Sequence, residues 1–521
     1  MLILIHLRAV YPLLTPTLEL NMQNNAFEEL TLYDDQQGHY DRVVNILNAN
    51  FFYIDTSEMG SGKTYVAVAV AKYFGFKILT ICPATLCEQS NDIPFAYGVE
   101  TFNAYSYQEI GGRRGCSLSH TLLTRRDYQV NGKDKVEFEP TPQLLHLINQ
   151  GVLFVFDEVQ SIKNLGIQHR ACGTICRAIM SPEGNSKSRF CYLSATPIDK
   201  EPQVENMCRN LGIITSDELY TNVMGDITLT GLDDMATYCE RINEAKSNEI
   251  LQKWRRMITP ANAKKCVFEL YTTIAKQEFL SDMPAPRIGF KKDAKNGYYK
   301  MSAGAEQEFS AAIHGLASCL KYDEGSGTVE EGGFGTISNW IGAIEKAKME
   351  IFIRKAKEDL VNIPKCKVVL AVQRQESIAA LYEALKEYEP LCLYGDVKMK
   401  ERGPIINAFQ KVPDKHRLLI VSIKVGSIGL SMHDTIGNAP RRMYIVPNYS
   451  LMDSHQASGR VYRVGLKSDA FVRFVYGKIA SKEMSIMNAY LKKTNTAKAV
   501  LGDNVASTVL FPGAYESEVE E

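Results

Sequence analysis

The sequence predicts an α/β protein with two parallel-sheet lobes, joined by a mostly helical insert. Short apolar runs alternate with helical segments from residue 51 to about residue 215, and the same alternation returns from about residue 367. Helical stretches dominate between these two regions. A chain of 521 residues is long enough for two to four domains. We divide it into lobe 1 at 1–215, a helical insert and linker at 216–350, lobe 2 at 351–510 and an acidic tail, expected to be disordered, at 511–521.

The overall composition excludes several classes of protein. Hydrophobic residues make up 45% and charged residues 23%, which is ordinary for a globular protein and excludes a disordered, collagen-like or coiled-coil chain. The net charge of −1 excludes a protein that coats nucleic acid by bulk positive charge. Twelve cysteines without a CxxC pair indicate free thiols in a reducing, intracellular compartment rather than zinc sites. The apolar start MLILIHL is expected to be a buried strand, and no apolar run is long enough to predict a membrane partner.

Four apolar runs predict the buried parallel strands of lobe 1. They are rich in β-branched and aromatic residues, and each ends at a turn or a polar residue. In chain order they are Phe51–Ile54, Lys77–Cys82, Val152–Phe156 and Phe190–Thr196.

The stretch SEMGSGKT, from Ser57 to Thr64, predicts a phosphate-binding loop. A buried strand precedes it and an apolar helix, Tyr65–Phe74, follows it, which is the context that such a loop requires. Gly60, Ser61 and Gly62 would direct backbone N–H groups at phosphates, Lys63 would supply a charge, and Thr64 would hold Mg²⁺. The alternative is a glycine-rich turn before an ordinary helix, since Ser57 replaces the first glycine of the full pattern.

The strand Val152–Phe156 is followed by two carboxylates, Asp157 and Glu158. At a strand end beside a phosphate loop, Asp157 is suited to the metal and Glu158 to polarising an attacking water. The stretch YLSATP, Tyr192–Pro197, would hydrogen-bond this acidic pair or the second lobe. Each stretch alone could be a chance strand ending, and their order gives them weight.

Gln36 lies upstream of the loop on a predicted helix, and its amide could bind adenine through paired hydrogen bonds. The alternative is an exposed glutamine on a first helix.

The insert is expected to contain helices at Ser247–Met257 and Ala303–Leu320, with an exposed loop at Glu324–Gly335. Lobe 2 then has five apolar runs that predict strands. These are Lys367–Val372, Pro390–Tyr394, Arg417–Ser422, Arg442–Val446 and Ala470–Tyr476.

Two motifs of lobe 2 can carry chemistry. Arg460 and Arg463 are three residues apart in HQASGRVYRVG and would share one face of a helix, from which both guanidinium groups could reach a γ-phosphate. The alternative is a solvated basic helix face. Before them, Gly426 and Gly429 would let the backbone approach a phosphodiester chain.

In this order, the motifs resemble those of superfamily 2 helicases and translocases. Within that superfamily the chain is most similar to Swi/Snf-type DNA-dependent ATPases, whose loop DEMGLGKT also lacks the first glycine, and to helicases of large DNA viruses. Lys163–Asn164 after DEVQSI and the long join between the lobes fit the Swi/Snf type. Gln160, Gly459, Tyr462 and Ser431 depart from its usual residues.

The resemblance implies a P-loop NTPase of two RecA-like lobes with ATP and Mg²⁺ in the cleft between them. Gln456 is then expected near the nucleotide or the lobe interface. Nucleic acid would lie across the face formed by Pro83, Thr85, Gly426, Gly429 and Ser431.

The function that follows is an ATP-dependent translocase that moves along DNA, with duplex DNA favoured. The alternatives are a strand-separating DNA or RNA helicase and, in a different class, a non-catalytic nucleic-acid-binding scaffold. No protein partner is indicated.

Overall fold

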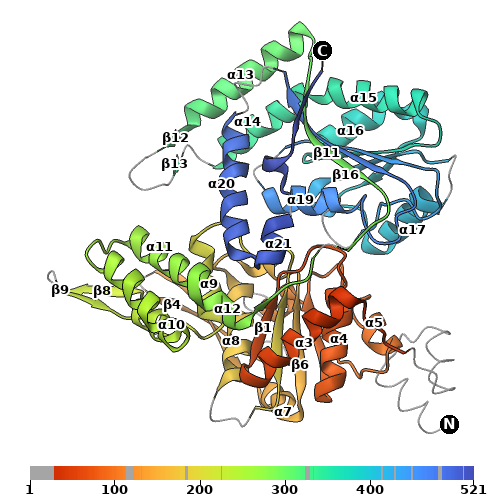
Figure 1. Cartoon of the computed structure of the whole chain (residues 1–521). Coiled ribbons are helices and arrows are strands. Elements are labelled where there is room, and N and C mark those ends of the chain that lie inside the picture. The colour runs from red at the N-terminus through yellow and green to blue at the C-terminus, as the bar shows by residue number, and fades with distance from the viewer. Residues whose placement is uncertain are drawn as a thin grey trace.

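Two parallel β-sheets, each flanked by helices, form the two lobes of the computed structural model (Figure 1). The lower lobe in Figure 1 contains the first sheet, and the upper lobe contains the second. The predicted α/β architecture is therefore confirmed. The structure describes residues 29–112, 121–130, 132–181, 186–223, 226–284, 286–322, 329–331, 334–411, 415–426, 430–447, 450–478, 484–508 and 510–520. The N-terminal strand that we predicted lies outside these residues.

The sheet of lobe 1 has six strands in the order β10-β1-β7-β6-β2-β3, and every pair is parallel. Its strands are β1 Phe52–Asp55, β2 Lys77–Cys82, β3 Tyr105–Ser106, β6 Val152–Asp157, β7 Arg189–Leu193 and β10 Leu280–Ser281. The four predicted strands are thus present. Their side chains are almost entirely buried, as expected for strands that helices cover on both faces.

Helices and one hairpin surround this sheet. The helices are α3 Asp34–Ala49, α4 Lys63–Phe74, α5 Asp92–Ala96, α6 Tyr107–Gly111, α7 Pro142–Gln150, η1 Val159–Ile162, α8 Ile167–Met180 and α9 Pro202–Asn210. The hairpin pairs β4 Leu123–Val130 with β5 Lys133–Pro140. Helix α3 packs beside α4, and α8 packs beside α9.

The sheet of lobe 2 has seven strands in the order β15-β16-β14-β17-β18-β11-β19, again all parallel. Its strands are β11 Lys292–Tyr299, β14 Lys367–Val372, β15 Leu391–Leu393, β16 Leu418–Ser422, β17 Arg441–Ile445, β18 Ala470–Gly477 and β19 Ser517–Val519. Its helices are α15 Met349–Asn362, α16 Gln375–Ala384, η4 Lys386–Tyr388, α17 Met399–Lys411, α18 Ile423–Gly426, α19 Leu451–Gly459, α20 Met484–Val500, α21 Asp503–Thr508 and η6 Pro512–Ala514.

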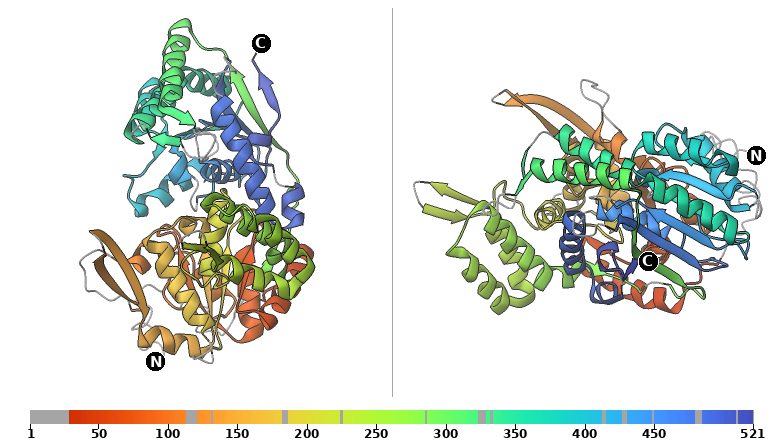
Figure 2. Two further views of the ribbon diagram at one scale, coloured as in Figure 1. Left: turned by 90° about the vertical axis from the view of Figure 1, so that its left-hand side faces the viewer. Right: turned by 90° about the horizontal axis from the view of Figure 1, so that it is seen from above.

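The segment between the lobes is not one insert. Its first part carries α10 Gly231–Arg255, α11 Pro260–Leu270, η3 Tyr271–Ala275 and α12 Lys276–Phe279, whose apolar faces join the core of lobe 1. The hairpin of β8 Tyr220–Val223 and β9 Asp226–Leu229 projects beside them (Figure 2). Its second part carries α13 Ala303–Cys319, β12 Leu320–Tyr322, β13 Val329–Glu331 and α14 Phe334–Ala347, and the two helices pack together as a separate apolar cluster.

The predicted boundaries at 215, 350 and 510 are accordingly wrong in detail. Strand β10 belongs to the sheet of lobe 1, and β11 pairs with β18 along its whole length in lobe 2. The prediction that the acidic tail is disordered is also wrong, because β19 within it pairs with β11 at the sheet edge. The sequence KDAKNGYY of β11 lacks an apolar strand pattern because this strand is only partly buried, although it pairs with β18 and β19 on its two sides. The sequence SEV of β19 lacks one because it is a short, largely exposed strand at the sheet edge.

Among the helices that the structure describes, none has the length and apolar character needed to cross a bilayer.

Candidate functional site

The predicted phosphate loop connects the end of β1 to the start of α4. Gly60 and Gly62 have φ angles of +78° and +91°, which glycine adopts without strain. The ammonium of Lys63 lies inside the loop, where Nζ donates to the carbonyl oxygens of Ser57 at 3.0 Å and Glu58 at 3.3 Å. The loop therefore presents the N-terminus of a 12-residue helix and a lysine to one point, which is a ready anion-binding arrangement.

Gln36 packs directly on this loop. Its Nε2 donates to the carbonyl of Ser61 at 2.9 Å, and its Oε1 accepts from the backbone N–H of Tyr33 at 3.1 Å. A Cβ on Gly62 would lie 2.3 Å from Gln36 Nε2, so the glycine is needed for space as well as for its φ angle. The alternative of an exposed surface glutamine is wrong, since Gln36 is 7% exposed.

The two carboxylates lie where β6 ends. Asp157 accepts the backbone N–H of Glu158 at 2.9 Å, and Glu158 has a φ of +53°, a left-handed conformation that costs about 1 kcal/mol for a residue with a Cβ. Burial, followed by the neighbouring charge of Glu158, raises the pKa of Asp157 to about 7. Asp157 is thus a carboxyl group whose ionised form needs a nearby positive charge.

Glu158 is the centre of a hydrogen-bond network within lobe 1. Gln160 Nε2 donates to Glu158 Oε2 at 2.6 Å, and Ser194 Oγ donates to Gln160 Oε1 at 2.6 Å. The SAT stretch therefore reaches the acidic pair through Gln160. Sequence reasoning noted Gln160 only as a departure from the family, and its position two residues after Glu158 was the available signal.

Lobe 2 contacts the same carboxylate. Gln456 Nε2 on α19 donates to Glu158 Oε2 at 3.1 Å, and Arg460 Nη2 lies 3.9 Å from Glu158 Oε1. Burial, and then the charge of Arg463, lowers the pKa of Arg460 to about 10, so Arg460 stays charged at neutral pH. Gln456 thus lies at the lobe interface.

The phosphate loop itself also meets α19. His455 Nε2 lies 3.5 Å from Glu58 Oε1. Burial raises the pKa of Glu58, but His455, Lys292 and Lys63 together lower it below its ordinary value. Glu58 is therefore ionised at neutral pH and faces lobe 2.

The two arginines do not share a helix, which corrects our expectation. Helix α19 ends at Gly459, and the backbone then forms tight turns, with Arg460 N–H donating to Ala457 O and Tyr462 N–H to Gly459 O. Arg463 Nη1 donates to Ser431 Oγ at 2.8 Å. The turn still brings both guanidinium groups to one cavity. The prediction that they lie together is therefore confirmed, but a turn and not a shared helix face brings them together.

This cavity of about 440 Å³ lies between the lobes. All five residues predicted to be catalytic line it, together with the predicted metal ligand Thr64 and residues that sequence reasoning missed. The lining residues are Met59, Gly60, Gly62, Lys63, Thr64, Tyr65, Leu86, Gln89, Asp157 and Glu158 from lobe 1, and Ser431, His433, Arg460, Arg463 and Val464 from lobe 2. Burial and Arg463 lower the pKa of His433 to about 4, so it faces the cavity as a neutral ring.

Parts of this chain are similar to known proteins. Residues 353–465 match the helicase conserved C-terminal domain. A protein of Acanthamoeba polyphaga mimivirus that is named as an ATP-dependent RNA helicase is 23% identical over 477 residues, covering 90% of this chain and 83% of its own length. A protein of Orgyia pseudotsugata multicapsid polyhedrosis virus, named as a global transactivator, is 30% identical over 148 residues, or 28% of each chain.

The second lobe therefore contains a helicase conserved C-terminal domain, and 90% of the chain is similar to a viral protein that is named as an ATP-dependent helicase.

Among solved structures, the SWI2/SNF2 ATPase core of Sulfolobus solfataricus in complex with double-stranded DNA is 15% identical, covering 93% of this chain and 97% of its own, with a TM-score of 0.30. The same core without DNA in its description is 16% identical, covering 89% and 91%, with a TM-score of 0.30.

The residues predicted to touch nucleic acid come from both lobes of the structure. Pro83 and Thr85 lie in the turn after β2, and Gly426 is the buried last residue of α18. Gly429 lies outside the described residues. Ser431 has a contact that the prediction did not include, because its hydroxyl accepts a hydrogen bond from Arg463 and lines the interlobe cavity. Spacing along a loop does not determine which side a hydroxyl faces.

Gly459, a departure from the Swi/Snf pattern, lies against the phosphate loop. A Cβ at this position would lie 2.7 Å from Met59 Cε of the phosphate loop. Glycine therefore lets α19 approach the loop closely.

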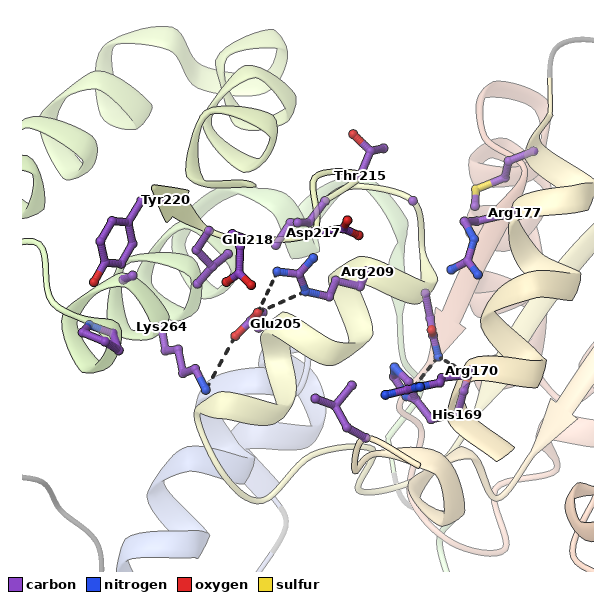
Figure 3. Close-up of a pocket in the computed structure, with 18 of the residues that line it drawn as sticks. His169, Arg170, Arg177, Glu205, Arg209, Thr215, Asp217, Glu218, Tyr220 and Lys264 are labelled. Carbon is purple, nitrogen blue, oxygen red and sulfur yellow. Dashed lines mark hydrogen bonds and ion pairs between the residues drawn. The ribbon is translucent and has the colours of Figure 1, made fainter. Parts of the chain in front are cut away.

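A larger cavity of about 1280 Å³ lies outside the nucleotide cleft, among α8, α9 and α11 (Figure 3). Glu205 projects into it and pairs with Arg209 at 2.9 Å and Lys264 at 3.9 Å. None of the residues predicted to be catalytic lines this cavity, so it is not the nucleotide site.

Proposed function

We propose that this chain is an ATP-driven translocase that moves along duplex DNA. The observation that carries the proposal is that both lobes contact Glu158. Its carboxylate accepts hydrogen bonds from Gln160 of lobe 1 and Gln456 of lobe 2, and Arg460 of lobe 2 lies nearby. Closure of the lobes and assembly of the hydrolytic site are therefore one event. Nucleotide binding can then drive lobe movement to the extent that it favours the closed state.

The residues divide the proposed work between the lobes. Lys63 and the start of α4 bind the β- and γ-phosphates, and Glu158 orients the attacking water. Arg460 and Arg463 stabilise the charge that develops on the transferred phosphate. The remaining amide hydrogen of Gln36 is available to adenine, beside the loop that this residue supports.

The cleft also fits Mg²⁺. Thr64 and Asp157 line it together, and the raised pKa of Asp157 shows a buried carboxyl group that a cation would stabilise. When bound, Mg²⁺ would neutralise phosphate charge during transfer. Thr64 and Asp157 are the residues that would hold it.

The preference for duplex DNA rests on the resemblance to the Swi/Snf type, in particular SEMGSGKT and Lys163–Asn164. The second candidate is a strand-separating helicase, which the named activity of the mimivirus relative favours. A non-catalytic scaffold is disfavoured, because Lys63, Glu158 and Arg460 line one cavity. The unpaired thiols among the described cysteines support an intracellular, reducing compartment.

One set of assays separates these functions. The ATPase rate is measured with duplex DNA, single-stranded DNA and RNA, beside displacement of a labelled strand and of a triplex-forming third strand. A duplex translocase hydrolyses ATP most rapidly with duplex DNA and removes the third strand without separating the duplex. Separation of the two duplex strands would establish the helicase instead, and equal rates with and without nucleic acid would contradict both.

A further inference from the structure

A fully buried contact between a histidine and a carboxylate lies beneath the phosphate loop and takes no part in the proposed chemistry. His39 Nε2 on α3 lies 2.9 Å from Asp55 Oδ2 at the end of β1, and both side chains have 0% exposure. Burial raises the pKa of Asp55, but His39, Lys63 and Ser57 together lower it below its ordinary value. Asp55 therefore stays ionised in the interior.

The second carboxylate oxygen of Asp55 holds the first residue of the loop. Asp55 Oδ1 accepts the backbone N–H of Ser57 at 2.9 Å and also its hydroxyl. Ser57 Oγ in turn accepts the backbone N–H of Met283 at 3.0 Å. The serine that replaces the first glycine of the common loop pattern thus connects the loop to residues more than 200 positions away.

Those residues form the exit from lobe 1, which we call the crossover strap, residues 280–283. Ser281 Oγ hydrogen-bonds His39 Nδ1 at 2.8 Å, and the carbonyl of Ser281 accepts the N–H of Thr56 at 3.1 Å. The chain next enters a sheet at β11, which lies in lobe 2. Hydrogen bonds thus link His39, Asp55 and Ser57 in a row, and the strap binds both ends of this row, His39 through Ser281 and Ser57 through Met283.

The strap also contacts the C-terminal helices. Lys276 Nζ, just before it, donates to the carbonyl oxygens of Ala499 and Leu501 at 3.0 Å each. A Cβ on Gly502 would lie 1.8 Å from Asp282 Oδ1, so the turn between α20 and α21 lies directly against the strap. The phosphate loop, the strap and the C-terminal helices thus form one contiguous stack.

We propose that Asp55, His39 and Ser281 are positioning residues that couple the phosphate loop to the crossover strap. A buried contact of this kind is weak evidence for stability, since apolar residues often replace even buried ionic pairs without loss. Its directional hydrogen bonds instead fix the loop and the strap relative to each other. A change in the loop on ATP binding is then transmitted to the segment that enters lobe 2. This inference rests on the proposed function.

The coupling can be measured directly. The readout is the coupling factor, the ratio of the dissociation constants for a labelled duplex DNA with and without a non-hydrolysable ATP analogue and Mg²⁺. For the wild-type chain we expect a factor of about 5 to 150, the usual range for coupled sites. Ser281→Ala removes one hydroxyl of the chain without touching the loop, and it should reduce the factor at least threefold. Ser281→Thr, which keeps a hydroxyl, should restore it.

Ser188→Ala is the matched control. Ser188 is also 0% exposed in lobe 1, and its hydroxyl binds the N–H of Val152 at 2.8 Å and the carbonyl of Ile148 at 2.7 Å, away from the loop. It should lower the melting temperature in the same way as Ser281→Ala and leave the coupling factor unchanged. His39→Gln, on the other side of the same hydrogen bond, should give the loss seen in Ser281→Ala.

The outcomes are distinct. Full coupling in Ser281→Ala and His39→Gln would overturn the inference and leave the proposed motor intact. Equal loss of coupling in Ser188→Ala would also overturn it, because any buried hydroxyl would then have the same effect. A wild-type factor of 1 would refute the proposed function itself.

Discussion

Glu158→Gln is the most informative single substitution in the nucleotide cleft. Glu158 Oε2 accepts hydrogen bonds from Gln160 and Gln456, and an amide oxygen at the same place can accept both. The substitution keeps the shape of the side chain and removes the negative charge 3.9 Å from Arg460. The lobes should therefore still close on ATP.

The lost charge should affect hydrolysis far more than binding. A positioned general base contributes about 100- to 10,000-fold to a rate, which corresponds to about 3–5 kcal/mol of barrier. We expect kcat to fall by that factor while the dissociation constant for ATP changes by less than about threefold. Because Glu158 also raises the pKa of Asp157, its removal should not weaken metal binding by Asp157.

The assay combines single-turnover hydrolysis of radiolabelled ATP with binding of a fluorescent ATP analogue, both with saturating nucleic acid. Glu205→Gln is the control, since Glu205 is paired with Arg209 outside the cleft. This control should retain wild-type kcat. A fall in kcat of less than tenfold in Glu158→Gln, or an equal loss of rate and affinity, would refute the assignment of Glu158 as the base.

Three further predictions concern the groups around this carboxylate. Lys63→Ala should abolish ATPase activity in a phosphate-release assay, and near-full turnover would contradict the loop assignment. Arg463→Ala should lower kcat by about 1,000-fold or more with a much smaller loss of ATP affinity, as for an arginine that acts on the transition state, and equal losses would make it a binding residue. Asp157→Asn should abolish activity and stabilise the nucleotide-free protein at pH 8. The pKa of Asp157 rises from 3.8 to about 7 on folding, so the folded state binds the extra proton between these values and loses on the order of 2–4 kcal/mol as pH rises through this window. Thermal unfolding at pH 5.5 and pH 8 should show this difference in the wild type and a smaller one in Asp157→Asn, and identical profiles would refute it.

The core strands could be predicted from the sequence because burial imposes a pattern on them. Strands β6 and β14 are continuous apolar runs, and both are buried along almost their whole length. Strands β10, β11 and β19 carry no such pattern. The edge strands β10 and β19 have two and three residues and are too short to show one, and β11 is only partly buried. Because these strands were not predicted, the boundaries of the lobes were predicted wrongly as well.

The convergence of Lys63 and Asp157 on one cavity could be predicted, because both belong to motifs whose residue types the proposed chemistry requires. The supporting half of the site could not be predicted in this way. His39 and Ser281 are 242 positions apart and belong to no pattern, and only the fold brings them to Asp55. The contact between Ser431 and Arg463 could not be predicted either, because the sequence does not determine which way a hydroxyl in a glycine-containing loop faces.

The central claim is that the two lobes act on a single triphosphate. The most direct test is a crystal structure with Mg²⁺ and a non-hydrolysable ATP analogue. We expect the γ-phosphate within hydrogen-bond distance of Lys63 Nζ on one side and of Arg460 or Arg463 on the other. A nucleotide bound by lobe 1 alone, with both guanidinium groups directed away from it, would contradict the account.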